Sequence, residues 1–151
     1  QQELATVGKD LPQLYDYYKL MVELLKDKWN LGIRMRAAYK AGNRDELTVC
    51  ADVCGGLVPK YRAVRDAAYT LWMWENKPQG FEMFDLRLSG MAGRCESTEK
   101  RLRQYLKGEI DRLEELEDET LYFDPGRKGM MPHSALFRKV FSAATEMGVY
   151  T

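Results

Sequence analysis

The sequence is poor in the side chains from which most catalytic and metal sites are built. Its 151 residues include a single histidine, His133, and only three cysteines. A Ser-His-Asp hydrolytic site would have to use that one imidazole, and no Gly-x-Ser-x-Gly segment is present to expose a nucleophilic serine. We therefore predict that this chain carries no catalytic residue, no cofactor-binding residue and no metal ligand.

The sequence also lacks an excess of either charge and any long apolar run. Lys plus Arg number 23 and Asp plus Glu number 23, so the formal net charge is zero. A neutral chain has no bulk attraction to nucleic acid or to an anionic membrane, and no apolar run reaches the length of a membrane span. We expect neither as a partner. The start, Gln1-Gln2-Glu3-Leu4, resembles neither a signal peptide nor a natural initiator, which favours a piece of a longer protein.

The three cysteines are Cys50, Cys54 and Cys95. An odd number argues against a disulfide framework. Structural zinc takes four nitrogen or sulfur ligands, which these thiols and the distant His133 do not readily supply. We interpret them as small, buried apolar side chains in a reducing, cytoplasmic compartment.

Apolar residues recur at intervals of three and four along most of the chain, which is typical of core-facing helices. The spacing predicts long helices over about 11–41, 44–75 and 81–107. The core-facing stripe of the first consists of Leu11, Leu14, Tyr18, Met21 and Leu25. No window alternates strictly enough to predict a strand. The sequence therefore predicts one all-α domain over 1–151, with an up-down-up three-helix bundle core.

The C-terminal part is less regular. Residues 110–116 favour a short helix, Asp124-Pro125-Gly126 a turn, and 134–147 a final helix. We expect an irregular, partly helical tail over 122–151.

Several large apolar side chains exceed what a lone bundle needs. Apolar positions cover more than half the circumference of the first helix. Trp72 and Trp74 are two residues apart and point in nearly opposite directions, so both cannot face one core. Exposed aromatic groups of this kind mark contact surfaces, although the irregular tail is an alternative cover for them. The candidate interface residues are Trp72, Trp74, Arg87, Tyr17, Leu20 and Leu24.

Two arginine-based interpretations stay open beside this one. For Arg87, the simpler role is a structural ion pair that holds helices together. Small helical bundles such as chorismate mutases also bind dicarboxylates between helices through basic side chains. The arginines available for that role are Arg34, Arg36, Arg62, Arg65 and Arg87, and their spacing follows no clear pattern.

A connected series of segments resembles a known domain. It comprises Trp74-Glu75-Asn76-Lys77-Pro78, Gly80-Phe81-Glu82, Asp85-Leu86-Arg87-Leu88-Ser89-Gly90, Arg94, Tyr105-Leu106-Lys107-Gly108-Glu109-Ile110, Glu114-Glu115-Leu116 and Leu121, and Leu31 to Gly42 fits as well. This series resembles the helical C-terminal domain of bacterial exo-β-N-acetylhexosaminidases of glycoside hydrolase family 20. The resemblance covers about the first 120 of the 151 residues.

The resemblance implies a parent with a small α/β domain, a catalytic barrel and this helical domain. Such a parent removes terminal N-acetylhexosamine residues by substrate assistance, with an Asp-Glu pair on the barrel. No residue here corresponds to that pair. The acidic run Glu114, Glu115, Glu117, Asp118 and Glu119 has no apolar frame to raise a carboxyl pKa, which favours a solvated surface.

We therefore expect a non-catalytic domain that docks on the catalytic barrel of its parent, helps the parent to form a homodimer, or does both. The alternatives are a free-standing helical protein-interaction module and, less favoured, a small helical enzyme of the chorismate-mutase type. Catalytic activity of the isolated chain would distinguish the small enzyme from the two non-catalytic functions.

Overall fold

A computed structural model of the protein describes residues 11–118. The helices are α2 (Pro12–Lys28), α3 (Leu31–Lys40), α4 (Arg44–Glu75), α5 (Glu82–Lys107) and α6 (Glu114–Glu117). Between residues 11 and 118 there is no strand, and the predicted all-α class is confirmed. The tail predicted over 122–151, with its helix over 134–147, lies outside the described residues.

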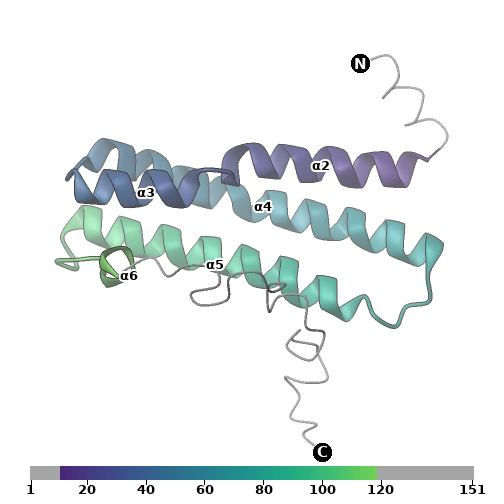
Figure 1. Cartoon of the computed structure of the whole chain (residues 1–151). Helices are drawn as coiled ribbons and strands as arrows, with labels where there is room; N and C mark the ends of the chain where they lie inside the picture. The colour runs from purple at the N-terminus through teal and green to yellow at the C-terminus, as the bar shows by residue number, and fades with distance from the viewer. Residues whose placement is uncertain (1–10, 119–151) are drawn as a thin grey trace, which may run out of the picture.

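The long helix α4 is the centre of the structure. Figure 1 shows α2 and α3 lying end to end and passing in front of α4, with α5 running below them along the length of α4. All three pack closely on α4, whereas no Cα atom of α2 or α3 comes within 8 Å of one in α5. The three predicted core segments therefore run up, down and up as expected. Tyr39 of α3 also contacts Tyr105 of α5, with ring centroids 5.4 Å apart, so side chains join the two outer segments.

The core lies mainly on α4 because this helix is covered from two directions. Nine of its residues are buried: Leu47, Cys50, Ala51, Cys54, Leu57, Val58, Tyr61, Val64 and Ala68. The neighbouring helices contribute fewer buried residues, among them Leu24 and Leu31 from one side and Cys95 and Leu102 from the other. This unequal sharing leaves large parts of α2, α3 and α5 open to other contacts.

The helix predicted over 11–41 is in fact two helices, which corrects the sequence-based boundary. The chain leaves helical geometry at Asn30, where φ is −116° and ψ is 7°. Asn and the nearby Gly32 are poor helix formers, which weakens the helix at this point. The Trp29 N–H still donates to the Leu25 carbonyl at 2.9 Å, and the Arg34 N–H to the Asn30 carbonyl at 3.0 Å. The two helices therefore continue end to end.

The other helix boundaries follow from recognisable end signals. The Asn43 side chain accepts a hydrogen bond from the Glu46 N–H at 3.0 Å and so caps the start of α4. Gly108 ends α5 with a φ of 74°, a left-handed conformation that favours glycine. The predicted starts and ends of the second and third helices are confirmed to within a residue.

Candidate docking surface

A row of large apolar side chains runs along the outer side of α2 and α3. Tyr18, Val22, Leu25, Trp29 and Ile33 are exposed by 58, 52, 45, 86 and 76%. The spacing of three and four residues places the first four on one side of α2, and Trp29 and Ile33 line one groove across the break. We call these five residues the α2–α3 ridge. Contact between so much apolar area and water is unfavourable, and continuous patches of this kind are typical of interaction surfaces.

The ridge lies where the sequence predicts part of the core. Tyr18 and Leu25 belong to the predicted core-facing stripe, yet both are exposed. The face that packs on α4 instead carries three of the predicted interface residues. Leu24 is only 2% exposed, and Tyr17 and Leu20 pack partly buried against the core. The face of α2 that packs on α4 is therefore centred one residue position away from the predicted stripe. Leu24 is buried in that contact.

The two tryptophans near the end of α4 have different environments. Trp72 packs against Phe81 and Phe84, with ring centroids 6.4 and 5.6 Å apart. Its indole N–H also donates to the Lys77 carbonyl at 2.7 Å, which fixes the loop between α4 and α5. Trp74 is 53% exposed. Trp72 thus stabilises the loop, and of the two only Trp74 exposes a large part of its surface.

Arg87 is exposed on α5 and forms no salt bridge with any residue between 11 and 118. The structural ion pair expected for it is therefore not found there. The carboxylate nearest in sequence, Asp85, pairs with Arg65 of α4 at 2.7 Å. The ion pair that links α4 to α5 at this point is therefore made by Arg65 and not by Arg87.

The arginines considered for a dicarboxylate site bind separate acceptors. Arg34 pairs with Glu46 at 2.7 Å, and Arg62 with Glu96 at 2.8 Å. Arg36 donates to the Asp118 carbonyl at 2.6 Å. With Arg65 on Asp85, four of the five are engaged with four different partners, so they do not converge on one ligand.

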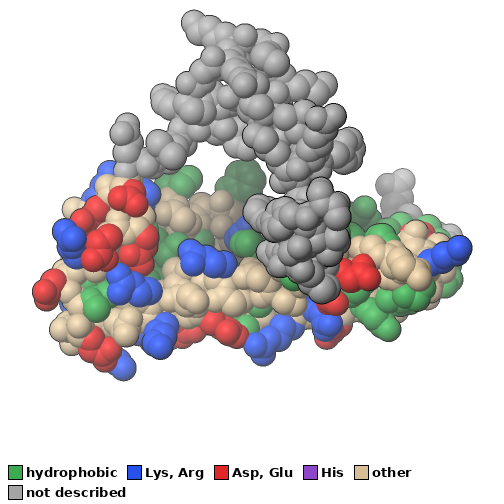
Figure 2. All heavy atoms as spheres, turned by 90° about the horizontal axis from the view of Figure 1, so that it is seen from below, with side chains coloured by type: hydrophobic (Ala, Val, Ile, Leu, Met, Phe, Trp, Pro, Cys, Tyr) green, Lys and Arg blue, Asp and Glu red, His purple; other side chains and the backbone are tan. Residues whose placement is uncertain are grey.

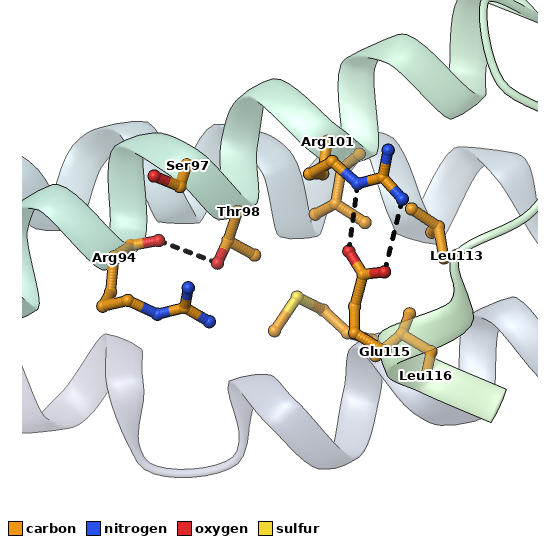
Figure 3. Close-up of a pocket in the computed structure, with 9 residues that line it drawn as sticks. Arg94, Ser97, Thr98, Arg101, Leu113, Glu115 and Leu116 are labelled. Carbon is orange, nitrogen blue, oxygen red and sulfur yellow. Dashed lines mark hydrogen bonds and ion pairs between the residues drawn. The ribbon is translucent and has the colours of Figure 1, made fainter. Parts of the chain in front are cut away.

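A cavity of about 250 Å³ lies between α3, α5 and α6. Its lining residues are Met35, Arg94, Ser97, Thr98, Arg101, Leu102, Leu113, Glu115 and Leu116. Figure 3 shows Arg94 and Arg101 on the same side of α5, with Glu115 reaching across from α6 to meet Arg101. The distance from Arg101 Nε to Glu115 Oε1 is 3.3 Å, and Arg101 Nη2 lies 2.9 Å from Glu114 Oε2.

Neither Arg94 nor Arg101 is among the predicted interface residues. The signal that points to them is the seven-residue spacing of Arg87, Arg94 and Arg101, which keeps all three on one side of α5.

The three thiols are free and buried, as predicted. Burial raises the pKa of Cys54 to about 12, so this thiol stays protonated at neutral pH. Within residues 11–118, no group of three or more His, Cys, Asp or Glu side chains is placed to hold a metal ion. His133 lies outside the described residues.

The described part of the acidic run lies on the surface, at or next to α6. The Arg101 side chain lowers the pKa of Glu115 by hydrogen bonding to its carboxylate. A backbone hydrogen bond is the largest cause of the lowered pKa of Glu114. A general acid needs a raised carboxyl pKa, so these two carboxylates are suited to ion pairing.

Comparison with known proteins places the chain in a family context. A family model described as the glycoside hydrolase 20C C-terminal domain matches residues 1–135. No curated protein matches the chain.

None of the helices between residues 11 and 118 combines the length and apolar character needed to cross a membrane.

Proposed function

Because the chain belongs to the glycoside hydrolase 20C C-terminal domain family, we propose that it is the non-catalytic helical domain of a longer glycoside hydrolase and packs on the catalytic domain of that enzyme. The observation that carries the proposal is the α2–α3 ridge, five large apolar side chains in one exposed row. The resemblance in sequence extends the proposal to the parent, which we take to remove terminal N-acetylhexosamine residues.

The ridge has the composition of the centre of an interface. Aromatic residues are enriched in interface cores and often contribute most of the binding free energy. Trp29, at 86% exposure, has the most surface to lose on docking. Complete burial of one such side chain stabilises an interface by about 1.5–3 kcal/mol. Covering the ridge therefore provides a strong driving force for packing against a second apolar surface.

The test is to replace Trp29 and Ile33 by lysine in the full-length enzyme. Two charges on the ridge should separate the domains, lower the melting temperature and shorten the lifetime of activity on a chromogenic N-acetylhexosaminide. Val49→Lys is the matched control, because Val49 is 45% exposed on α4 outside the ridge. Equal behaviour of the ridge variant and the control would contradict docking through this face.

Two further measurements separate the competing functions. Hydrolysis of the same substrate by the isolated chain would contradict a non-catalytic role. Sedimentation of the isolated chain tests for a homodimer: self-association that Trp29→Lys abolishes would assign the ridge to a second copy instead of the catalytic domain.

A further inference from the structure

Three arginines form a row along one side of α5. Arg87, Arg94 and Arg101 are seven residues apart, which is almost two full turns, so neighbours in the row are about 10 Å apart along the helix axis. We propose that Arg87 and Arg94 bind carboxylate side chains on the catalytic domain of the parent enzyme. This inference rests on the proposed function and adds the chemistry of the partner surface.

The end of the row shows the type of contact that we propose. At Arg101, the carboxylates of Glu114 and Glu115 come from a separate segment, α6, and lie 2.9 and 3.3 Å from guanidinium nitrogens. The planar guanidinium offers several N–H donors at once, which suits a carboxylate better than a single charge does. One of the three arginines, Arg101, thus already binds an acidic segment on this side of α5.

Arg87 and Arg94 differ from the other described arginines. The side chains of the remaining eight each contact a carboxylate or a backbone carbonyl within residues 11–118: Arg34, Arg36, Arg44, Arg62, Arg65, Arg101, Arg103 and Arg112. Arg87 and Arg94 have no such side-chain contact in this part of the chain. Two cations at regular spacing, both exposed, are complementary to a surface that carries carboxylates.

The surroundings of Arg94 define the partner more closely. Arg94 lines the cavity beside Met35, Leu102 and Leu116, so an apolar side chain next to the partner carboxylate has a place to enter. Carboxylates seven residues apart on one side of a helix match the spacing of about 10 Å.

The position of the cavity connects this site to the ridge. Leu116 of α6 lines this cavity and also a groove that Trp29 and Ile33 of the ridge line, so the two surfaces adjoin at Leu116. In Figure 2, Lys and Arg side chains lie among acidic and apolar ones on the face seen from below. A single large partner, such as a catalytic domain, is therefore expected to cover the ridge and reach the row.

The experiment compares arginine reactivity in the full-length enzyme and in the isolated 151-residue chain. Phenylglyoxal, which modifies accessible guanidinium groups, is the probe, and mass spectrometry reports each site. Arg87 and Arg94 should react about tenfold more slowly in the full-length enzyme, the factor that 1.4 kcal/mol of contact free energy gives. Arg62, which forms an exposed ion pair with Glu96, is the control. It should react at the same rate in the full-length enzyme and in the isolated chain.

Hydroxyl-radical footprinting of Trp29 in the same two samples separates this inference from the proposed function. Protection of Trp29 with unchanged reactivity of Arg87 and Arg94 would overturn the carboxylate contact and leave docking in place. If neither Trp29 nor the arginines are protected, both proposals are contradicted.

A charge reversal provides an independent check. Arg87→Glu with Arg94→Glu in the full-length enzyme should weaken Trp29 protection, because like charges then face each other. Lys100→Glu, an exposed residue on another side of α5, is the matched control and should leave Trp29 protection unchanged. Full Trp29 protection in the double variant would overturn the proposal.

Discussion

At the scale of single residues, Cys54 illustrates how the core changes the chemistry of a side chain. Burial raises its pKa from 9.0 to about 12, and the thiolate is the reactive form. In the native protein at pH 8, we expect Cys54 to react with a disulfide reagent far more slowly than after unfolding in urea. Absorbance of the released thiol measures both rates. Equal rates would contradict a buried, protonated thiol.

The same shift predicts a pH dependence of stability. The unfolded thiol loses its proton near its ordinary pKa of 9.0, while the folded one keeps it. The folded state then binds more protons, so the free energy of unfolding falls as the pH rises above about 9. Cys54→Ala removes this contribution and serves as the control in denaturant titrations at pH 8 and 10.

The pKa of Glu115 is shifted in the opposite direction, downward. The Arg101 guanidinium holds its pKa below the ordinary value of 4.5. The ion pair therefore contributes stability above the unfolded pKa, and that contribution is lost as the pH falls through the lowered folded value. NMR titration of the Glu115 carboxyl carbon should give a midpoint below 4.5, and Arg101→Gln should move it upward. A midpoint that Arg101→Gln does not change would contradict the pairing.

At the scale of elements, two adjacent glycines of α4 make a matched pair. A Cβ at Gly56 would meet no atom within 4 Å, whereas one at Gly55 would lie 2.7 Å from Glu99 Oε2. Gly56→Ala should raise the free energy of unfolding by about 0.5–1 kcal/mol, the usual gain for alanine in a helix. Gly55→Ala should gain less because it displaces a carboxylate that pairs with Arg103. In a Glu99→Ala background, the two substitutions should become equivalent in urea unfolding.

The break between α2 and α3 also belongs to this scale. Apolar periodicity continues through Trp29 and Ile33, so pattern alone predicts one helix. The backbone departs from helical geometry at Asn30, and a local conformation of one or two residues leaves little trace in a pattern that spans the whole segment.

At the scale of the whole molecule, the central position of α4 determines which substitutions are costly. Leu57 of α4 is completely buried in the core. Leu57→Ala should lower the free energy of unfolding by about 2–5 kcal/mol, through lost burial and the cavity left behind. Val49→Ala, on the exposed side of the same helix, should cost less than about 1 kcal/mol. Urea denaturation followed by circular dichroism measures both, and similar costs would contradict the burial of Leu57 in the core.

The sequence by itself determined the helical class, the bounds of the second and third long helices and the family. Apolar residues at intervals of three and four require helices, whatever these pack against. Asn43 and Gly108 mark helix ends through their own backbone and hydrogen-bonding preferences. The buried state of the three thiols was also predictable, because Cys50, Cys54 and Cys95 lie on the apolar stripes of their helices.

Only the tertiary structure decided which apolar face of α2 is covered. Its apolar residues occupy more than half the circumference, so several rotations about the helix axis bury similar areas. Packing on α4 buries Leu24 and leaves Tyr18 and Leu25 in the exposed ridge. Similarly, the spacing of Arg87 and Arg94 was visible in the sequence, but their lack of an ion-pair partner between residues 11 and 118 was not. Ion pairing depends on which distant carboxylates the packing brings within reach.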